Sequence, residues 1–419
     1  MTQRNMPPDE SLNRAPIGFV EFVALIAALM ALTALGIDSM LPALPAIGVA
    51  LDVADENSRQ FIITAFMVGF AFAMLVYGPM TDRFGRRPVL MVALTGYVLT
   101  NLLAAIAGSF ELLLIARMAS GAMVAGARTV TVALVRDCFS GRAMARVMSL
   151  AFIVFMIVPV LAPAFGQLVL LVADWRWIFG GIALCAALVL IWFMARMPET
   201  LAVEDRRPLR LGLLADGARK VARDRCAVGY TLAATALQGG LFGFIGSIQQ
   251  IVFDIFKVPH LLALVFASVA GTMAIGSFVN SRIVMKYGTR LISHTALIGF
   301  IVMAIVHLVV SLSGVETLIN FIVVQALMMA CFGLATSNFS AMAMEHMGDI
   351  AGTAASLQGF VATLGAALIG AYIGQSYDGT TVPLYIGFTS MGLTALVVVL
   401  VAERGRMFRP AHEPVIRRD

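Results

Sequence analysis

The stretch GPMTDRFGRRP, residues 78–88, is a short basic segment between two long apolar runs. These runs cover residues 60–81 and 88–110, and a membrane-spanning helix needs about 20 predominantly apolar residues. Loops rich in lysine and arginine stay on the cytoplasmic side of a membrane. Residues 78–88 therefore predict two membrane helices joined by a tight cytoplasmic turn.

The composition of the whole chain agrees with this interpretation. Of the 419 residues, 60% are hydrophobic and 13% are charged, whereas a soluble domain carries about 25% charged residues. Because one apolar run follows another along the chain, a soluble enzyme is excluded. The first run is too long for a secretory signal and is interpreted as a retained span.

Six apolar runs precede a charged break and six follow it. The expected spans are 17–49, 60–81, 88–110, 112–135, 147–173 and 177–195, then 226–253, 261–281, 291–315, 317–344, 350–377 and 380–402. We predict an all-α polytopic membrane protein of twelve transmembrane helices. Its parts are an N-terminal six-helix bundle (1–196), a cytoplasmic linker (197–225), a C-terminal six-helix bundle (226–402) and a cytoplasmic tail (403–419). Leucines near 209–214 predict a short amphipathic helix in the linker.

Lysine and arginine set the orientation of the spans. Of the 29 basic residues, 24 lie in the terminal segments, in the linker, or in the loops after the second, fourth and eighth spans. These segments all fall on one side of the expected membrane, so both termini are predicted to be cytoplasmic. The halves also echo each other, because MKYGTR at 285–290 repeats the basic, aromatic, glycine and arginine order of DRFGRR at 82–87. Parallel repeats of this kind are one known transporter architecture.

Residues 78–88 resemble the loop signature of the major facilitator superfamily. Glycine permits a close backbone approach and a tight turn, and an aspartate can pair with arginine and cap the following helix. The resemblance implies the major facilitator fold, two pseudo-symmetric six-helix bundles that alternate access to a central site. It also implies a cytoplasmic gate. The gate residues would be Gly78, Asp82, Arg83, Gly85, Arg86 and Arg87, with Arg136 and Asp137 after the fourth span.

Other segments resemble the bicyclomycin-resistance (Bcr/CflA) branch of drug:proton antiporters. They are GIDSMLPALP at 36–45, RMASG at 117–121 with Ser120 in place of the usual glutamine, VRD at 135–137, WRWIF at 175–179, NSR at 280–282 and AGTAAS at 351–356. The fifth span departs from the antiporter pattern G-P-x-x-G-G. It keeps Pro163 and Gly166, lacks two glycines, and adds Pro159 as a second helix breaker. Helix kinks without a role in transport are the alternative interpretation.

Three charged residues lie deep within the expected spans, Asp38, Arg117 and Arg128, together with His294 and His307. Charged groups inside a bilayer are costly and indicate function. Arg117 and Arg128 are 11 residues apart, about three helical turns, so they share a face. Asp38 is the proton-site candidate, since burial disfavours a carboxylate charge and a nearby arginine favours it. Arg117 is its expected partner and Arg128 the second choice; a static Asp38–Arg117 ion pair is the alternative.

The sequence identifies the substrate-binding residues less clearly than the proton site. The candidate ligand contacts are Gln238, Phe242, Gln325, Phe332, Asn338 and Phe155. Polar residues within spans also tie helices together, and His307 is expected to be a packed neutral histidine. The 25 methionines would suit an adaptable binding surface.

Several chemistries have no motif in the chain. It lacks G-x-x-x-x-G-K and H-E-x-x-H, and its four cysteines lack metal-ligand spacing, so we expect no enzyme, cofactor or metal. The resemblance implies proton-coupled efflux of small amphipathic drugs by a monomer in a bacterial-type inner membrane. The implied partners are protons, a small molecule and the lipid bilayer, without nucleic acid. A dedicated metabolite exporter or proton symporter, and a non-transporting receptor or scaffold, are the alternatives.

Overall fold

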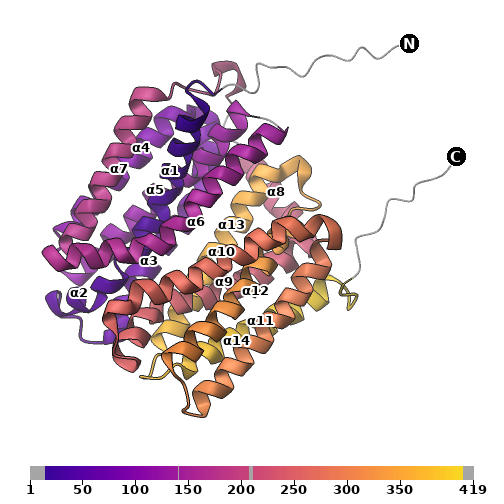
Figure 1. Cartoon of the computed structure of the whole chain (residues 1–419). Helices are drawn as coiled ribbons and strands as arrows, with labels where there is room; N and C mark the ends of the chain where they lie inside the picture. Colours follow the sequence, from indigo (N-terminus) through magenta and orange to yellow (C-terminus); the bar gives the residue numbers. More distant parts are fainter. Residues whose placement is uncertain (1–14, 140, 207–210, 409–419) are drawn as a thin grey trace. The chain divides into compact units, whose positions relative to one another are not determined.

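A computed structural model describes residues 15–139, 141–206 and 211–408 of the chain. Within these ranges the chain is helical and contains no strand (Figure 1). The helices are α1 (Phe19–Asp38), α2 (Leu44–Ala50), α3 (Phe61–Phe84), α4 (Arg86–Ala105), α5 (Phe110–Cys138), α6 (Gly141–Val172), α7 (Arg176–Arg196), α8 (Leu211–Arg223), α9 (Arg225–Gln250), α10 (Leu262–Tyr287), α11 (Thr289–Leu312), α12 (Leu318–Ala343), α13 (Ala351–Gln375) and α14 (Val382–Ala402). The all-α prediction is confirmed.

The described helices correspond to the expected spans. Eleven of the described segments are long and apolar enough to cross a membrane, and the first of them, Phe19–Ala50, contains both α1 and α2. The fifth expected span corresponds to α6, in which the described apolar part is Ile157–Val172. The remaining helix, α8, lies in the predicted linker, where the leucine pattern indicated a short helix.

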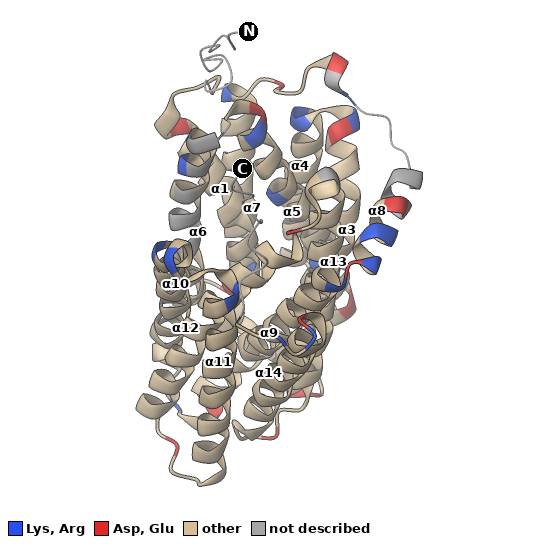
Figure 2. Ribbon diagram, turned by 90° about the vertical axis from the view of Figure 1, so that its right-hand side faces the viewer, with Lys and Arg blue, Asp and Glu red and all other residues tan. Residues whose placement is uncertain are grey.

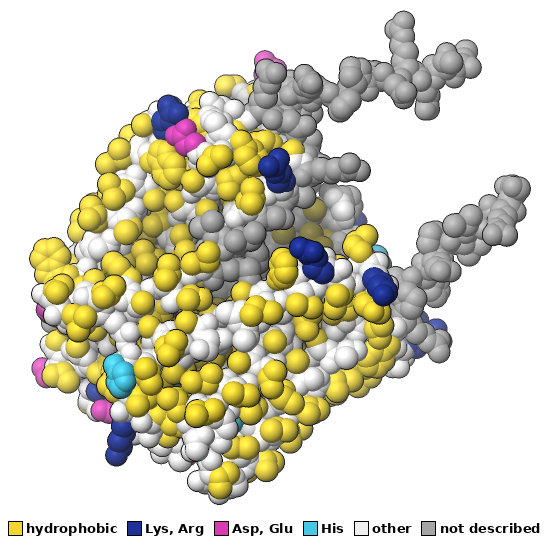
Figure 3. All heavy atoms as spheres, in the orientation of Figure 1, with side chains coloured by type: hydrophobic (Ala, Val, Ile, Leu, Met, Phe, Trp, Pro, Cys, Tyr) yellow, Lys and Arg dark blue, Asp and Glu magenta, His cyan; other side chains and the backbone are white. Residues whose placement is uncertain are grey.

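Charged and apolar side chains are sharply separated along these helices. In Figure 2 the charged residues gather at helix ends, in connections and on α8, whereas the helix shafts are almost free of them. The face drawn in Figure 3 is largely hydrophobic. Large apolar side chains such as Leu171, Val172 and Leu184 are exposed on α6 and α7. Apolar side chains can face lipid, and a helix satisfies its own backbone hydrogen bonds. Helices with such a surface can therefore cross a bilayer.

The chain divides into two compact units. Unit 1 contains Met1–Asp52 and Ala65–Arg210, and unit 2 contains Val53–Thr64 and Leu211–Asp419. The division between them thus falls within the predicted linker. The segment Val53–Thr64, which the span order places in the first half, packs with the helices of unit 2.

Each unit contains one pair of helices held together by reciprocal glycines. In unit 1, a side chain at Gly69 would strike the backbone of Met118 on α5, and one at Gly121 would strike the backbone of Phe66 on α3. In unit 2, α10 and α12 meet in the same way through Gly276 and Gly333. Small residues let membrane helices approach closely. Since α3 and α5 are the second and fourth spans, and α10 and α12 the eighth and tenth, this packing supports the parallel repeat.

Candidate functional site

The first span is interrupted directly after its carboxylate. Helix α1 ends at Asp38, a 3-10 turn covers Leu41–Ala43, and α2 continues to Ala50. Pro42 and Pro45 follow the break, and proline cannot donate the backbone hydrogen bond that a continuous helix requires. Asp38 therefore lies at an interruption within the span, with further helix on both sides.

Helix α6 packs against this break through Gly166. A side chain at Gly166 would collide with the carbonyl group of Ser39 and with the ring of Pro42. Pro159 and Pro163 both lie inside α6, and Pro163 is buried. Gly166, the glycine that the fifth span keeps from the antiporter motif, therefore allows α6 to pack closely against the backbone next to Asp38.

The Asp38 side chain is buried, and one of its carboxylate oxygens has no hydrogen-bond partner among the described residues. Its residue is 5% exposed, and its Oδ1 atom contacts no donor in the described structure. A buried carboxylate that lacks a partner is energetically costly, and such costs concentrate at functional positions. This environment fits a group that changes its protonation state better than it fits a permanent ion pair.

Arg117 holds the end of α1 and forms no described ion pair with Asp38. Its Nη2 atom donates to the carbonyl oxygen of Gly36 over 2.6 Å. Its guanidinium carbon lies 4.4 Å from the ring centre of Phe66 and 5.6 Å from that of Phe179. The Gly36 carbonyl belongs to the last turn of α1, where carbonyls lack helical partners. The fully buried Arg117 thus satisfies a backbone group next to the break, in place of the static bridge considered above.

Arg128 and Tyr97 are two further polar residues of unit 1, and of the two only Tyr97 has a described contact with α1. Arg128, expected on the same face as Arg117, is exposed and stands 5.8 Å above the ring of Phe70. Tyr97 on α4 is fully buried and donates to the carbonyl oxygen of Leu32 over 3.1 Å. Tyr97 gave no signal in the sequence, because it lies in an ordinary apolar run.

A network around Arg86 occupies the predicted cytoplasmic end of unit 1. Arg86 Nη1 donates to Asp82 over 2.7 Å, and its Nε donates to Asp137 over 3.0 Å. Thr200 also donates to Asp137, over 3.0 Å. The Arg86 side chain is 3% exposed, that of Asp137 is 14% exposed and that of Asp82 is 45% exposed. The buried guanidinium thus joins one sheltered carboxylate and one partly exposed carboxylate. The sequence-predicted association of Asp82, Arg86 and Asp137 is present.

The other predicted gate residues have separate surroundings. Gly78 lies inside α3, so the tight turn forms at Gly85 alone, where φ is +98°. Arg87 donates to the carbonyl oxygen of Met194, and Arg83 lies over the ring of Phe84. Arg136 is exposed, with no partner among the described residues.

Asp82 does not cap the helix that follows it, contrary to our expectation. It lies in the last turn of α3, and its carboxylate accepts a hydrogen bond from Arg86. The cap of α4 comes from Glu199, whose carboxylate accepts the backbone N–H groups of Arg86 at 2.9 Å and Arg87 at 3.2 Å. A carboxylate there satisfies free N–H groups and the positive end of the helix dipole. Glu199 follows α7, far away in sequence, which is why the loop motif did not reveal it.

Unit 2 contains a counterpart built on Arg290. Gly288 has a φ of +81°, as Gly85 does in the first repeat. Arg290 donates to Glu345 and Glu403, each over 2.9 Å, and Tyr230 donates to Glu403. The echo at 285–290 therefore forms a second charge network, but the buried arginine lies two residues after the glycine instead of one.

The same end of unit 2 holds Asp224, which caps α9. Its Oδ1 accepts the backbone N–H of Ala227 over 2.7 Å, and its Oδ2 lies 2.9 Å from Nδ1 of His346. Partial burial alone would raise the pKa of Asp224, but these two hydrogen bonds outweigh burial and hold the pKa below its ordinary value.

The predicted substrate residues fall into two groups. Gln325 and Asn338 are buried and engaged within unit 2, where Gln325 accepts from Tyr385 over 3.1 Å and Asn338 donates to Asn280 over 2.7 Å. Phe332 is buried as well. Gln238 and Phe242 on α9 are half-buried, and the side chain of Phe155 lies outside the described residues.

The sequence analysis missed a cluster of amide side chains in unit 2. Gln60 donates to Gln250 over 2.7 Å and to the carbonyl oxygen of Gly374 over 3.1 Å. Gln250 donates in turn to Asn57, and Gln375 donates to the Asn57 backbone. These bonds explain why Val53–Thr64 packs with unit 2. The cluster lies at the C-terminal ends of α9 and α13, the ends opposite the Arg290 network.

The fold agrees with comparisons to known proteins. Residues 26–371 match the family model described as Major Facilitator Superfamily. The chain also resembles the xylose transporter XylE from E. coli, captured in a partially occluded inward-open conformation, with a TM-score of 0.72. That likeness covers 94% of this chain and 99% of the other at 12% identity. The chain belongs to the Major Facilitator Superfamily and is a multi-pass inner-membrane protein.

Within this family, the chain is similar to proteins that are named for drug resistance. The chain is 31% identical over 395 residues to a bicyclomycin resistance protein homolog of Haemophilus influenzae, covering 90% of this chain and 94% of the relative. It is 27% identical over 337 residues to a chloramphenicol resistance protein of Pseudomonas aeruginosa, covering 79% and 78%. The resemblance that the sequence motifs indicated is confirmed.

Proposed function

We propose that the chain exports small amphipathic drugs from the cell in exchange for protons. The family supplies the transport fold, and the relatives named for resistance to bicyclomycin and chloramphenicol support drug export. Major facilitator proteins move substrates by alternating access to a site near the middle of the membrane. No motif for ATP hydrolysis occurs in the chain, so an ion gradient is the energy source we assign.

The observation that carries the proton coupling is the environment of Asp38. Its carboxylate is buried at a break in the first span, and Oδ1 has no hydrogen-bond donor in the described structure. Such a group gains from binding a proton, and it can release that proton when water or a cationic group reaches it. Gly166 of α6 packs against the break and Arg117 of α5 donates to the Gly36 carbonyl oxygen beside it, so both helices fix the backbone around Asp38.

For the basic loops, we propose two roles. The described partners of Arg86 lie in unit 1 and those of Arg290 in unit 2, so each network would keep the end of its own unit rigid during transport. Arg136 is exposed and has no described partner. It is therefore the gate residue we expect to form new ion pairs when the conformation changes.

Drug resistance of cells that overproduce the protein tests this function. The panel includes bicyclomycin, chloramphenicol and unrelated amphipathic cations, and it compares wild type, Asp38→Asn and Asp216→Asn. Asp216 lies on α8 with its side chain 73% exposed, so its variant controls for the removal of one carboxylate. We expect wild type and Asp216→Asn to raise resistance and Asp38→Asn to lose it at equal protein levels.

The same panel separates the alternatives. Resistance to a single compound would indicate a dedicated exporter. No resistance, together with no substrate flux in proteoliposomes of the purified wild type, would contradict a transporter and indicate a receptor or scaffold.

A further inference from the structure

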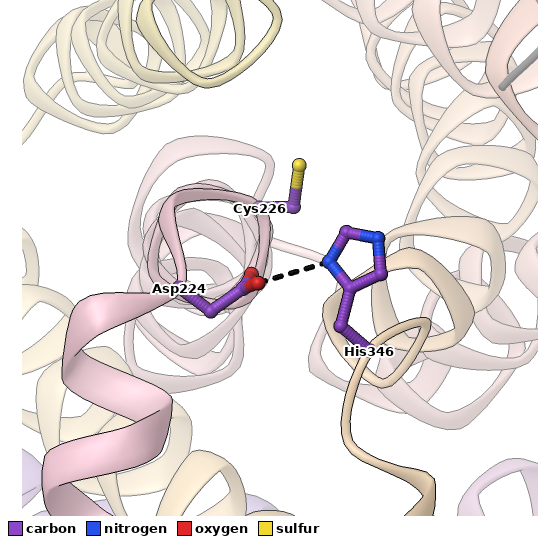
Figure 4. A group of neighbouring side chains, drawn as sticks. All are labelled: Asp224, Cys226 and His346. Atoms are coloured by element: carbon purple, nitrogen blue, oxygen red, sulfur yellow. Dashed lines mark hydrogen bonds and ion pairs between the residues drawn. The ribbon is translucent and has the colours of Figure 1, made fainter. Parts of the chain in front are cut away.

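A group of metal-ligating side chains lies where the linker enters α9. Asp224 precedes α9, Cys226 is the second residue of that helix, and His346 lies in the turn after α12. In Figure 4 the Asp224 carboxylate and the His346 ring face each other, with Cys226 beside them. One ligand atom of each residue lies within 4.8 Å of the other two. All three belong to unit 2.

Packing beneath the group fixes the two segments that carry it. Val221, Ala227, Met347 and Ala354 form a buried apolar cluster, against which Met344, Ile350 and Leu357 pack. The cluster joins the α8–α9 junction to the turn that holds His346. The backbone N–H of Ala227 additionally fixes the Asp224 carboxylate through Oδ1. The positions of these side chains are therefore set by the fold, and less reordering is needed on binding an ion.

Charged groups of both signs surround the three proposed ligands. Cys226 lies near the carboxylates of Asp224, Glu345 and Glu403 and near the guanidinium of Arg290. Arg290 is already shared between Glu345 and Glu403. With the exposed Arg223 and Arg225, which lie next to Asp224 in sequence, three guanidinium groups accompany three carboxylates, so the preference for a cation comes from the ligand atoms themselves. His346 is 56% exposed and Asp224 23% exposed, so an ion can reach them from solution.

The donor atoms determine which ion fits. One carboxylate oxygen, one imidazole nitrogen and one sulfur are the ligand types of Zn²⁺ and similar transition metals, whereas Ca²⁺ and Mg²⁺ take oxygen ligands. Metal–ligand bonds of about 2.0–2.3 Å place tetrahedral ligands roughly 3.3–3.8 Å apart. The Asp224–His346 contact of 2.9 Å would have to open slightly and the sulfur would have to approach.

We propose that Asp224, Cys226 and His346 bind one divalent transition-metal ion of the Zn²⁺ type through Oδ2, Sγ and Nδ1, with water as the fourth ligand. Cys226 binds as the thiolate and releases its proton to solvent, and Nδ1 of His346 binds unprotonated. The ion ties the end of the linker to the end of α12 and stiffens this part of unit 2. This site is independent of drug transport, and the long sequence distance from Cys226 to His346 hid it from spacing rules.

Cobalt absorption of the purified, tag-free, reduced protein tests the site. We expect Co²⁺ to produce a near-ultraviolet thiolate-to-metal band that saturates at one ion per chain and disappears on addition of Zn²⁺. Cys226→Ser should abolish the band, and the matched variant Cys331→Ser, which changes a half-buried cysteine elsewhere in unit 2, should keep it. A wild type without a saturable band, or an unchanged band in Cys226→Ser, would overturn the proposal.

Zn²⁺ affinity and melting temperature, measured on further variants, distinguish the loss of a ligand from the loss of folding. Asp224→Asn keeps an oxygen that can cap α9 but removes the ligand charge. Loss of an outer-shell partner already costs a metal site about 10–100-fold in affinity, so Asp224→Asn and His346→Gln should weaken Zn²⁺ binding by at least about tenfold. Zn²⁺ should raise the melting temperature of the wild type and of Cys331→Ser. An equal rise in His346→Gln would contradict the assignment.

Discussion

Gly166 offers a direct test of how α6 packs against the break beside Asp38. In Gly166→Ala, the new Cβ would lie 2.9 Å from Cγ of Pro42 and 3.0 Å from the carbonyl carbon of Ser39. Carbon atoms in contact settle about 3.5–4.0 Å apart, and the carbonyl oxygen of Ser39 lies nearer still, so α6 and the break must separate by roughly 1 Å or more. Overpacking of this kind costs about 1–3 kcal/mol.

The consequence is measurable in stability and in transport. We expect Gly166→Ala to lower the melting temperature of the purified protein in detergent and to reduce drug export per molecule. Gly271→Ala on α10 is the matched control, because an added Cβ there meets nothing within 4 Å. Its melting temperature should not fall, since alanine is favoured over glycine in a helix by about 1 kcal/mol. If Gly166→Ala melts and transports like the wild type, the tight packing described here is wrong.

Three further substitutions test the charge networks and the repeat. Glu199→Ala removes the cap of α4 and should lower the free energy of unfolding by about 1 kcal/mol, whereas Glu204→Ala, at an exposed neighbouring position, should leave it unchanged. In Arg86→Lys, one ammonium group replaces a guanidinium that bonds two carboxylates through separate nitrogen atoms. Thermal unfolding should show a free energy of unfolding lower by about 1.5–3 kcal/mol. Gly121→Ala and Gly333→Ala should each cost about 1–3 kcal/mol if the reciprocal contacts are equivalent; a neutral result at either position would argue against that equivalence.

The sequence predicts the fold well because its signals are local. Apolar runs predicted the spans, and the loop at 78–88 predicted the tight turn, which forms at Gly85 with a positive φ. The family resemblance implied the grouping of Asp82, Arg86 and Asp137. The echo at 285–290 indicated a parallel repeat, and Gly288 has a positive φ as Gly85 does. Each of these features depends on residues a few positions apart, or on charges gathered at one side of the membrane.

What the sequence could not predict depends on contacts between distant segments. Glu199 caps α4 from beyond α7, and Gln60 pairs with Gln250 across 190 residues. Arg117 was expected to face Asp38, yet its nearest acceptor is the carbonyl oxygen of Gly36 on the same turn of α1. Spacing places a residue on a helix face, but it does not decide between a carboxylate and a backbone carbonyl two residues away.

Drug-driven proton movement tests the central claim about Asp38 most directly. Everted membrane vesicles are energised to acidify their interior, and a drug selected by the resistance panel is added while acridine orange reports the pH difference. The account predicts drug-dependent proton release in wild type and in Asp216→Asn, and none in Asp38→Asn, although that variant still binds the drug. Equal drug-dependent proton release from Asp38→Asn and wild type would contradict it.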